Sequence, residues 1–145
     1  MTEGRPRDIA LVTYDARPEV TDDDRHLADA LSARGLSVHA IPWSDRGAEW
    51  SAFGAVVVRS CWDYFHRASE FHAWLDRLEA EHARVHNGVR VLRWNADKTY
   101  LRDLDARGIP VIPTRWLEAG SPASLREIRR ETGWTELVVK PTVSG

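Results

Sequence analysis

Short apolar runs alternate with amphipathic stretches over the first two-thirds of the chain. The runs lie at 9–14, 38–43, 55–58 and 91–94, and their length and composition are typical of buried parallel strands. Between the last two runs, four apolar residues recur at helical spacing, namely Phe71, Trp74, Leu75 and Leu78. They predict a helix that begins at Ser69 and covers one face of a sheet.

An earlier helix is predicted between the first two strands. Aspartates at 22–24 supply candidate N-caps and a negative first turn, and Gly35 is expected to end the helix. This alternation of strands and helices is typical of an open parallel sheet with right-handed crossovers. We therefore predict the α/β fold class.

The pattern changes in the last third of the chain. Asn95 is expected to cap a helix that Gly108 ends, and residues 109–114 hold two prolines, which favours an edge strand or an extended connector. A short helix is expected from Ser121 and Pro122 to Gly133, followed by a strand at 136–140. The predicted boundary lies near 94–97, which gives a first domain at 1–94 and a second part at 95–145.

Composition narrows the classes of function. The chain is 43% hydrophobic and 29% charged, with a net charge of −2, which argues against binding to nucleic acid or to a membrane surface. Cys61 is the only cysteine, so we expect no disulfide and no cysteine-based metal site, and we assign Cys61 to packing. No apolar run resembles a membrane span or a signal peptide, so the expected location is cytoplasmic. The scattered glycines form neither a dinucleotide-binding fingerprint nor a P-loop.

Lysine is scarce in this chain. Of its 20 basic side chains, all but Lys98 and Lys140 are arginine. Lysine supplies a compact ammonium that a planar guanidinium does not replace. Retention of two lysines on the surface by chance is the alternative.

The first candidate site follows the third apolar run, where ligands of open α/β sheets bind. Arg59, Ser60 and Asp63 could orient a zwitterionic or carboxylate substrate, with Trp62 and Tyr64 as a stacking wall. A turn with an internal Arg59–Asp63 pair and two aromatic rings packed over the next helix explains the same residues. The spacing does not separate the two interpretations.

Two further candidates surround the lysines. If Asn95 is an N-cap, Lys98 lies in a first helical turn, where the dipole disfavours a cation unless an anion binds there. Lys140 ends a predicted strand and should point into a cleft, and the small residues up to Ser144 and Gly145 could begin a phosphate-covering loop. The alternative for Lys98 is a solvated side chain partly neutralised by its neighbouring aspartate.

Four segments together resemble the ATP-grasp superfamily, in particular bacterial ATP-grasp ligases related to O-ureido-serine cyclo-ligase. The family patterns are R-S-x-W-D-Y, W-N-x-D-K-x-Y-L, G-[IV]-P-x-[IV]-P-T and V-V-K-P. This chain matches them in the same order at 59–64, 94–101, 108–114 and 138–141. Each pattern is weak alone, but their order over most of the chain makes the resemblance specific.

The resemblance implies a Rossmann-like pre-ATP-grasp domain at 1–94, followed by the beginning of an ATP-grasp domain. It implies ATP and Mg²⁺ as cofactors, with Lys98 at the ATP phosphates and Lys140 along the nucleotide, and it implies activation of a carboxylate as an acyl phosphate. The glycine-rich loop expected after Ser144 and the family's metal ligands are missing from these 145 residues. We therefore expect an N-terminal portion that binds ATP poorly and has no catalytic activity alone.

Two alternatives remain at this stage. A receiver domain also carries acidic residues after its first strand, here Asp15, and a Lys-Pro pair, but its phosphoacceptor aspartate would stand where Arg59 and Ser60 lie. A non-catalytic partner domain would expose an unfinished sheet edge and self-associate through it. The expected partners are otherwise a small-molecule carboxylate or amino acid.

Overall fold

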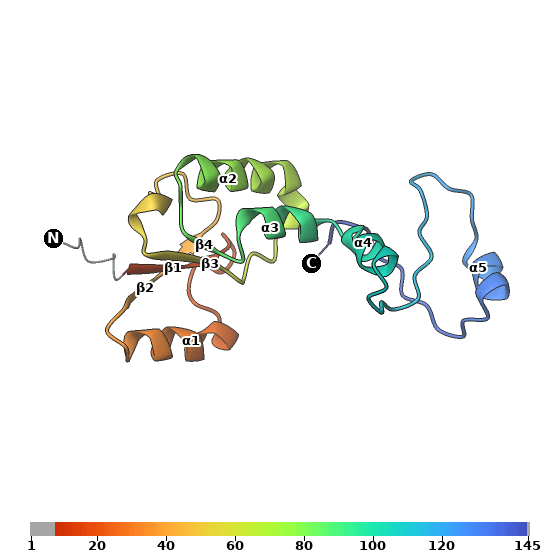
Figure 1. The fold of residues 1–145 in the computed structure, drawn as a ribbon, viewed down its shortest axis with the longest axis horizontal. Coiled ribbons are helices and arrows are strands. Elements are labelled where there is room, and N and C mark those ends of the chain that lie inside the picture. The colour runs from red at the N-terminus through yellow and green to blue at the C-terminus, as the bar shows by residue number, and fades with distance from the viewer. Residues whose placement is uncertain (1–7, 145) are drawn as a thin grey trace. The chain divides into compact units, whose positions relative to one another are not determined.

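Four parallel strands form an open sheet in the computed structural model, which describes residues 8–144 (Figure 1). Along the chain, the strands are β1 (Asp8–Thr13), β2 (Ser37–Pro42), β3 (Ala55–Val58) and β4 (Val85–His86). In the sheet they lie in the order β2-β1-β3-β4. Ile9 of β1 aligns with Val38 on one side and Ala55 on the other. The predicted α/β fold with an open parallel sheet is therefore confirmed.

Helices cover both faces of this sheet. Successive β1 side chains alternate, so that Ile9 belongs to the apolar cluster with α1 (Asp22–Ser32), whereas Ala10 belongs to the cluster with α2 (Ala68–Ala80). Figure 1 shows α1 on one side of the strands and α2 with α3 (Val89–Ala96) on the other. The sheet is thus buried on both faces, as parallel sheets require.

Aromatic rings dominate the cluster beneath α2. The predicted stripe is confirmed, since the residues Phe71, Trp74, Leu75 and Leu78 are all buried. Trp43 packs edge-on to Phe71 with ring centroids 5.5 Å apart, and Trp50, in a short 3-10 helix at Trp50–Ala52, packs on Trp74 at 5.6 Å. Edge-to-face contacts of this kind add to the stabilisation that comes from burial.

The fourth strand was predicted in the wrong place. Residues 91–94 lie in α3, where Val89, Leu92 and Ala96 are buried at spacings of three and four residues, and Val91 and Trp94 are exposed. The apolar residues there fit a helix stripe as well as a short strand, which is the usual ambiguity of such runs. The actual fourth strand is the two-residue β4, whose Val85 aligns with Val56.

Helix α1 begins where expected, but its cap differs. Its N-cap is Thr21, and the Thr21 hydroxyl donates to the Asp24 side chain at 3.3 Å instead of capping the helix backbone. Gly35, at a φ of +76°, follows the end of the helix as predicted.

The chain divides into two compact units between Ala96 and Asp97, and the second unit ends at Ser144. The second unit contains α4 (Tyr100–Ala106) and α5 (Leu125–Thr132). Asn95 does not cap α4, because it lies inside α3 and the N-cap is Thr99. Gly108, at a φ of +73°, ends α4 as predicted.

Helix α5 begins later than the sequence indicated. Ser121 and Pro122 lie before it, and its N-cap is Ser124. The Ser124 hydroxyl accepts from the Glu127 amide at 3.2 Å, and the Ser124 amide donates to the Glu127 carboxylate at 3.1 Å, which forms a capping box. Gly133 ends the helix in the left-handed conformation, as predicted.

The predicted last strand at 136–140 does not form in the structure. Val138 is 81% exposed and Val139 is 68% exposed. A strand needs a neighbour to satisfy its backbone groups, and within residues 8–144 the strand pairing involves only β1 to β4. Residues 109–114 likewise form no β-strand, so of the two predicted structures, an edge strand or an extended connector, they match the connector. Across residues 8–144, no helix combines the length and apolar character needed to cross a membrane.

Candidate functional site

The carboxyl ends of β1 and β3 lie side by side at the centre of the sheet. The chain passes from β1 to β2 on one side and then returns to β3 on the other, so the strand order reverses between β1 and β3. Ligands of open α/β sheets bind beyond the strand ends at such a reversal. Two segments follow these strand ends, Tyr14 with Asp15 after β1 and residues 59–64 after β3.

A buried carboxylate organises the segment after β3. The side chain of Asp24 in α1 is 7% exposed and accepts hydrogen bonds from Arg59 Nε, from Ser60 Oγ at 2.6 Å and from Thr21 Oγ1 at 3.3 Å. Burial alone would raise the pKa of Asp24, but the hydrogen bonds from Ser60 and Arg59 hold it below its usual value. Asp24 is therefore charged at neutral pH, and it was not among the predicted site residues.

Arg59 keeps much of its binding capacity free. Its side chain is 50% exposed, and within the described residues only Nε is hydrogen-bonded. A guanidinium has five N–H donors, so the two Nη groups remain available. The expected alternative of an internal Arg59–Asp63 pair is wrong, because Arg59 pairs with Asp24 and Asp63 pairs elsewhere.

Asp63 stabilises the segment at 59–64 through contacts with residues outside it. It accepts a hydrogen bond from the buried Trp43 indole Nε1 at 2.7 Å and lies 3.9 Å from Arg67 Nη1. These contacts explain its position without a ligand. Its predicted role in substrate binding remains a prediction.

The two aromatic residues of the motif differ in their surroundings. Trp62 is 46% exposed, and its ring lies 6.0 Å from that of Tyr14, the residue that follows β1. Tyr64 instead packs on Phe71 at 5.1 Å, and its hydroxyl donates to the Ala96 carbonyl at 3.5 Å. Of the predicted wall, Trp62 is accessible, whereas Tyr64 packs over the next helix.

Arg67, which was not among the predicted site residues, connects loops that are distant in sequence. Arg67, in the 3-10 helix Tyr64–Arg67, donates to Asp15 at 2.6 Å and to Glu70 at 2.8 Å. Asp15 also accepts from Ser44 after β2 at 2.5 Å, and these hydrogen bonds from Ser44 and Arg67 lower the pKa of Asp15. Asp15 and Arg67 are 52 residues apart, so no local spacing could reveal the pair.

Cys61 belongs to the core, as predicted. It is buried in the cluster beneath α2, and burial together with the charge of Asp63 raises the pKa of its thiol. A thiol in this environment is a poor nucleophile.

The second unit brings Lys98 and Ser144 together. The Lys98 ammonium donates to the Ser144 carbonyl at 2.5 Å and to its hydroxyl at 2.8 Å, and the Lys98 amide donates to the Thr142 carbonyl at 2.7 Å. The helix-dipole argument for Lys98 is wrong, because Lys98 precedes the N-cap Thr99 and α4 has only seven residues. The clustering of Lys98 with Ser144 is independent of that argument.

Lys140 has no comparable environment. It is exposed, and it makes no hydrogen bond or ion pair with any part of the chain that the structure describes. The strand expected to direct it into a cleft is missing, so its role rests on the sequence resemblance alone. Gly145, also predicted to contact nucleotide, lies outside the described residues.

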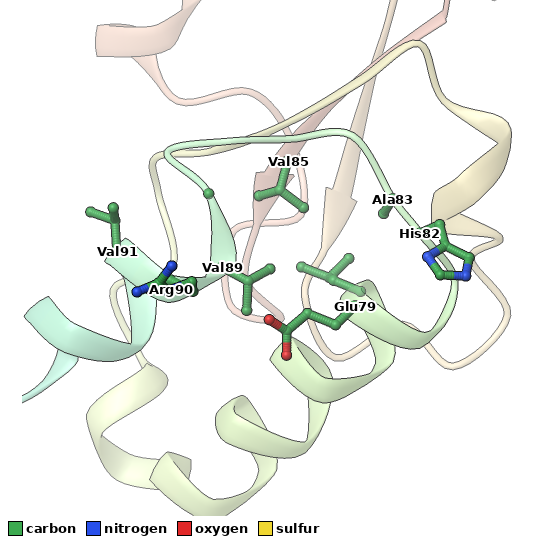
Figure 2. Close-up of a pocket in the computed structure, with 9 residues that line it drawn as sticks. Glu79, His82, Ala83, Val85, Val89, Arg90 and Val91 are labelled. Carbon is green, nitrogen blue, oxygen red and sulfur yellow. The ribbon is translucent and has the colours of Figure 1, made fainter.

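Two open cavities lie away from these residues. One of about 510 Å³ lies between the end of α2, β4 and the start of α3, where Glu79, His82, Val85, Val89 and Arg90 line it (Figure 2). The other, of about 710 Å³, lies along α5 and includes Arg126, Arg129 and Trp134. Neither contains a predicted site residue, and among residues 8–144 no three His, Cys, Asp or Glu side chains are grouped to hold a metal. We place the candidate site by its polar contacts, since both cavities are wide open to solvent.

Comparison with known proteins gives the same result at the levels of family, sequence and structure. Residues 9–87 match the family model described as D-cycloserine synthetase DcsG, N-terminal domain. The chain is 36% identical over 137 residues to the cycloserine biosynthesis protein DcsG of Streptomyces lavendulae, covering 92% of this chain and 46% of that protein.

The crystal structure of D-cycloserine synthetase DcsG superposes with a TM-score of 0.80 and 35% identity, over 95% of this chain and 47% of that one. The chain thus spans about half the length of the relatives that it matches. The family model alone covers more than half of the chain, and it includes β3, the motif at 59–64 and all of β1 except Asp8. This chain belongs to the family of the N-terminal domain of D-cycloserine synthetase DcsG.

Proposed function

We propose that this chain is the N-terminal part of an ATP-dependent ligase of the ATP-grasp type, which activates a small carboxylate as an acyl phosphate and acts in cycloserine-type biosynthesis. The observation that carries the proposal is the 36% identity to a cycloserine biosynthesis protein over 92% of the chain. That coverage extends beyond the family model, which ends at residue 87, into the unit that holds Lys98.

The geometry of Lys98 supports a phosphate-binding role. Its ammonium is held by two oxygen acceptors of Ser144, a carbonyl and a hydroxyl. Oxygens of an ATP phosphate are stronger acceptors of the same kind, so they would take the place of one or both. Lys140, Ser144 and Gly145 complete the proposed nucleotide contacts. The donor set described in this chain fits ATP but not Mg²⁺, so we assign no metal ligand to it.

The first unit is proposed to bind the carboxylate substrate. Arg59 offers free guanidinium donors, and Trp62 offers an exposed aromatic face on the same segment. Together with Ser60 and Asp63, these residues lie at the strand reversal where α/β proteins bind ligands.

The proposed chemistry is phosphoryl transfer. The substrate carboxylate attacks the terminal phosphorus of ATP, ADP leaves, and an amine or a related nucleophile then displaces phosphate from the acyl phosphate. The contribution of this chain's residues is positioning and electrostatic stabilisation, since lysine ammonium groups offset the charge that develops on phosphoryl oxygens.

An acyl phosphate can be trapped directly. The longest protein encoded in frame with this chain is incubated with ATP, Mg²⁺, a panel of amino acids and hydroxylamine, and hydroxamate and ADP are measured. We expect both products to form together with at least one amino acid, and Lys98→Ala to reduce both. If ADP forms but none of the amino acids gives hydroxamate, the result would contradict an acyl-phosphate route.

The receiver alternative makes the opposite prediction. Arg59 and Ser60 follow β3 where a receiver would carry its phosphoacceptor, so we expect no stable phosphorylation. Incubation of the chain with acetyl phosphate and mass spectrometry tests this. Stable phosphate on an aspartate would support a receiver and contradict the ligase proposal.

A further inference from the structure

We propose that Asp24 is a positioning residue, which fixes Arg59 so that its free guanidinium edge receives the carboxylate of a small 2-amino acid at the ends of β1 and β3. The inference deepens the proposed function by assigning the substrate end of the site. The binding itself is independent of ATP.

Asp24 differs sharply from its neighbours. Three aspartates follow one another in the first turn of α1, and Asp22 and Asp23 are exposed whereas Asp24 is buried. Burying a carboxylate is unfavourable unless it is paired and hydrogen-bonded. Asp24 satisfies this condition through Arg59 and the hydroxyls of Ser60 and Thr21. The contacts with Arg59 and Ser60 join α1 to the segment after β3.

The pairing leaves the useful side of Arg59 free. A pair that serves stability alone would engage the fork of the guanidinium or bury it, because bidentate pairs are the stronger ones. Here Asp24 accepts only from Nε, and half of the Arg59 side chain is exposed. The guanidinium is therefore held at one edge, while its Nη groups make no hydrogen bond within residues 8–144 and can receive a carboxylate.

Ser60 supports the position of Asp24. It is buried, and its hydroxyl proton is committed to Asp24 at 2.6 Å. We therefore assign Ser60 to holding Asp24 and thereby Arg59. This changes the expectation that Ser60 contacts the substrate.

The charges around Arg59 favour a zwitterion over a phosphate. At this end of the sheet Asp15, Asp63 and Glu70 share Arg67, and Asp24 balances Arg59. The charge of Arg46 also acts on Glu70, so four carboxylates stand against three guanidinium groups. This balance disfavours a dianion and suits a ligand that carries an ammonium beside its carboxylate. The exposed face of Trp62 offers an apolar surface for the rest of a small ligand.

Indole resonances of the 145-residue chain report binding. The Trp62 signal is assigned by its loss in Trp62→Phe, and wild type is titrated with D-serine, L-serine, serinamide and inorganic phosphate at constant ionic strength. We expect a saturable shift of the Trp62 signal with at least one serine enantiomer and none with serinamide or phosphate. The carboxylate site would be overturned if neither enantiomer gave a saturable shift, or if serinamide gave a shift equal to that of serine.

Matched variants separate positioning from folding. Arg59→Lys should abolish the shift, and Asp24→Asn should weaken serine binding several-fold, whereas Asp22→Asn makes the same charge change in the same turn and should leave affinity unchanged. Each variant is checked by urea unfolding, and Ser60→Ala serves as a milder second variant if Asp24→Asn does not fold. Folded Asp24→Asn, or folded Ser60→Ala in its place, with wild-type affinity would remove the positioning role.

Failure here is distinguishable from failure of the ligase proposal. The titration uses no ATP, and hydroxamate formation by the longer protein is measured separately. A negative titration with a positive hydroxamate assay would overturn the Asp24–Arg59 site and leave the proposed reaction in place.

Discussion

The guanidinium of Arg67 lies over the indole of Trp43, with 4.6 Å between its central carbon and the ring centroid. The same indole donates to Asp63, and the same guanidinium donates to Asp15. One residue pair therefore ties together the segments that follow β1, β2 and β3, on which the candidate site is built.

Arg67→Lys should weaken this connection while keeping the charge. A lysine cannot donate to Asp15 and Glu70 through two separate nitrogens, nor stack its planar group on Trp43. We expect the free energy of unfolding in urea to fall by about 1 kcal/mol. Arg25→Lys, which affects an exposed pair with Asp22, should change it by less than about 0.5 kcal/mol. Equal effects of the two substitutions would show that the connection contributes no more to stability than an exposed ion pair does.

Asp24 should make stability depend on pH in the acid range. Its folded pKa is lowered by Ser60 and Arg59 despite burial, so its contribution is present above the unfolded pKa of about 3.9 and is lost as pH falls through the folded pKa. Asp24→Asn should therefore be less stable than wild type at neutral pH, and the difference should shrink below about pH 4. Urea unfolding at several pH values measures it. A difference that grows on acidification would contradict the assigned direction.

The helical assignment of 89–96 can be tested with adjacent residues. Leu92→Ala should lower the free energy of unfolding by about 2–5 kcal/mol, because Leu92 is buried under α3. Val91→Ala, on the exposed side, should change it by less than about 0.5 kcal/mol. Chemical denaturation of both variants suffices. A larger loss of stability in Val91→Ala than in Leu92→Ala would contradict the helix and favour the predicted strand at 91–94.

The start of α5 distinguishes two serines. Ser124→Ala should remove the capping box and lower the stability of the helix by about 1 kcal/mol. Ser121→Ala, at the residue that the sequence suggested as the cap, should have little effect on α5. Amide hydrogen exchange of α5 in the two variants provides the comparison. Faster exchange in Ser121→Ala than in Ser124→Ala would place the cap at Ser121.

Lys140 tests the nucleotide half of the proposal. In the longest protein encoded in frame with this chain, Lys140→Ala should raise the apparent KM for ATP at least several-fold, since an ammonium contact to the nucleotide would be lost. Lys140 is exposed here, so folding should be unaffected. Arg126→Ala is a charge-matched exposed control. Unchanged ATP kinetics in Lys140→Ala would remove Lys140 from the site.

Sequence reasoning succeeded where the apolar pattern alone decides the structure. The strands β1, β2 and β3 and the stripe of α2 lie where periodicity placed them, because burial on one or two faces determines such segments. It failed at 91–94, where a helix and a strand fit the same residues, and at 136–140, where a strand would need a partner.

The contacts of the candidate site were less accessible from sequence. Arg59 and Trp62 were identified because they follow a buried strand. Asp24 and Arg67 were not, because their partners lie 35 and 52 residues away and meet them only after the sheet has formed. Polar networks of this kind depend on tertiary structure, which no local spacing encodes.

The burial of Cys61 has a practical consequence for spectroscopy. The chain has no other cysteine, and this thiol is enclosed in the core with a raised pKa. A cysteine introduced at an exposed position such as Trp62 or Arg126 would thus react selectively with maleimide probes in the folded protein. Fluorescent or spin labels can then be attached one at a time without first removing the native cysteine.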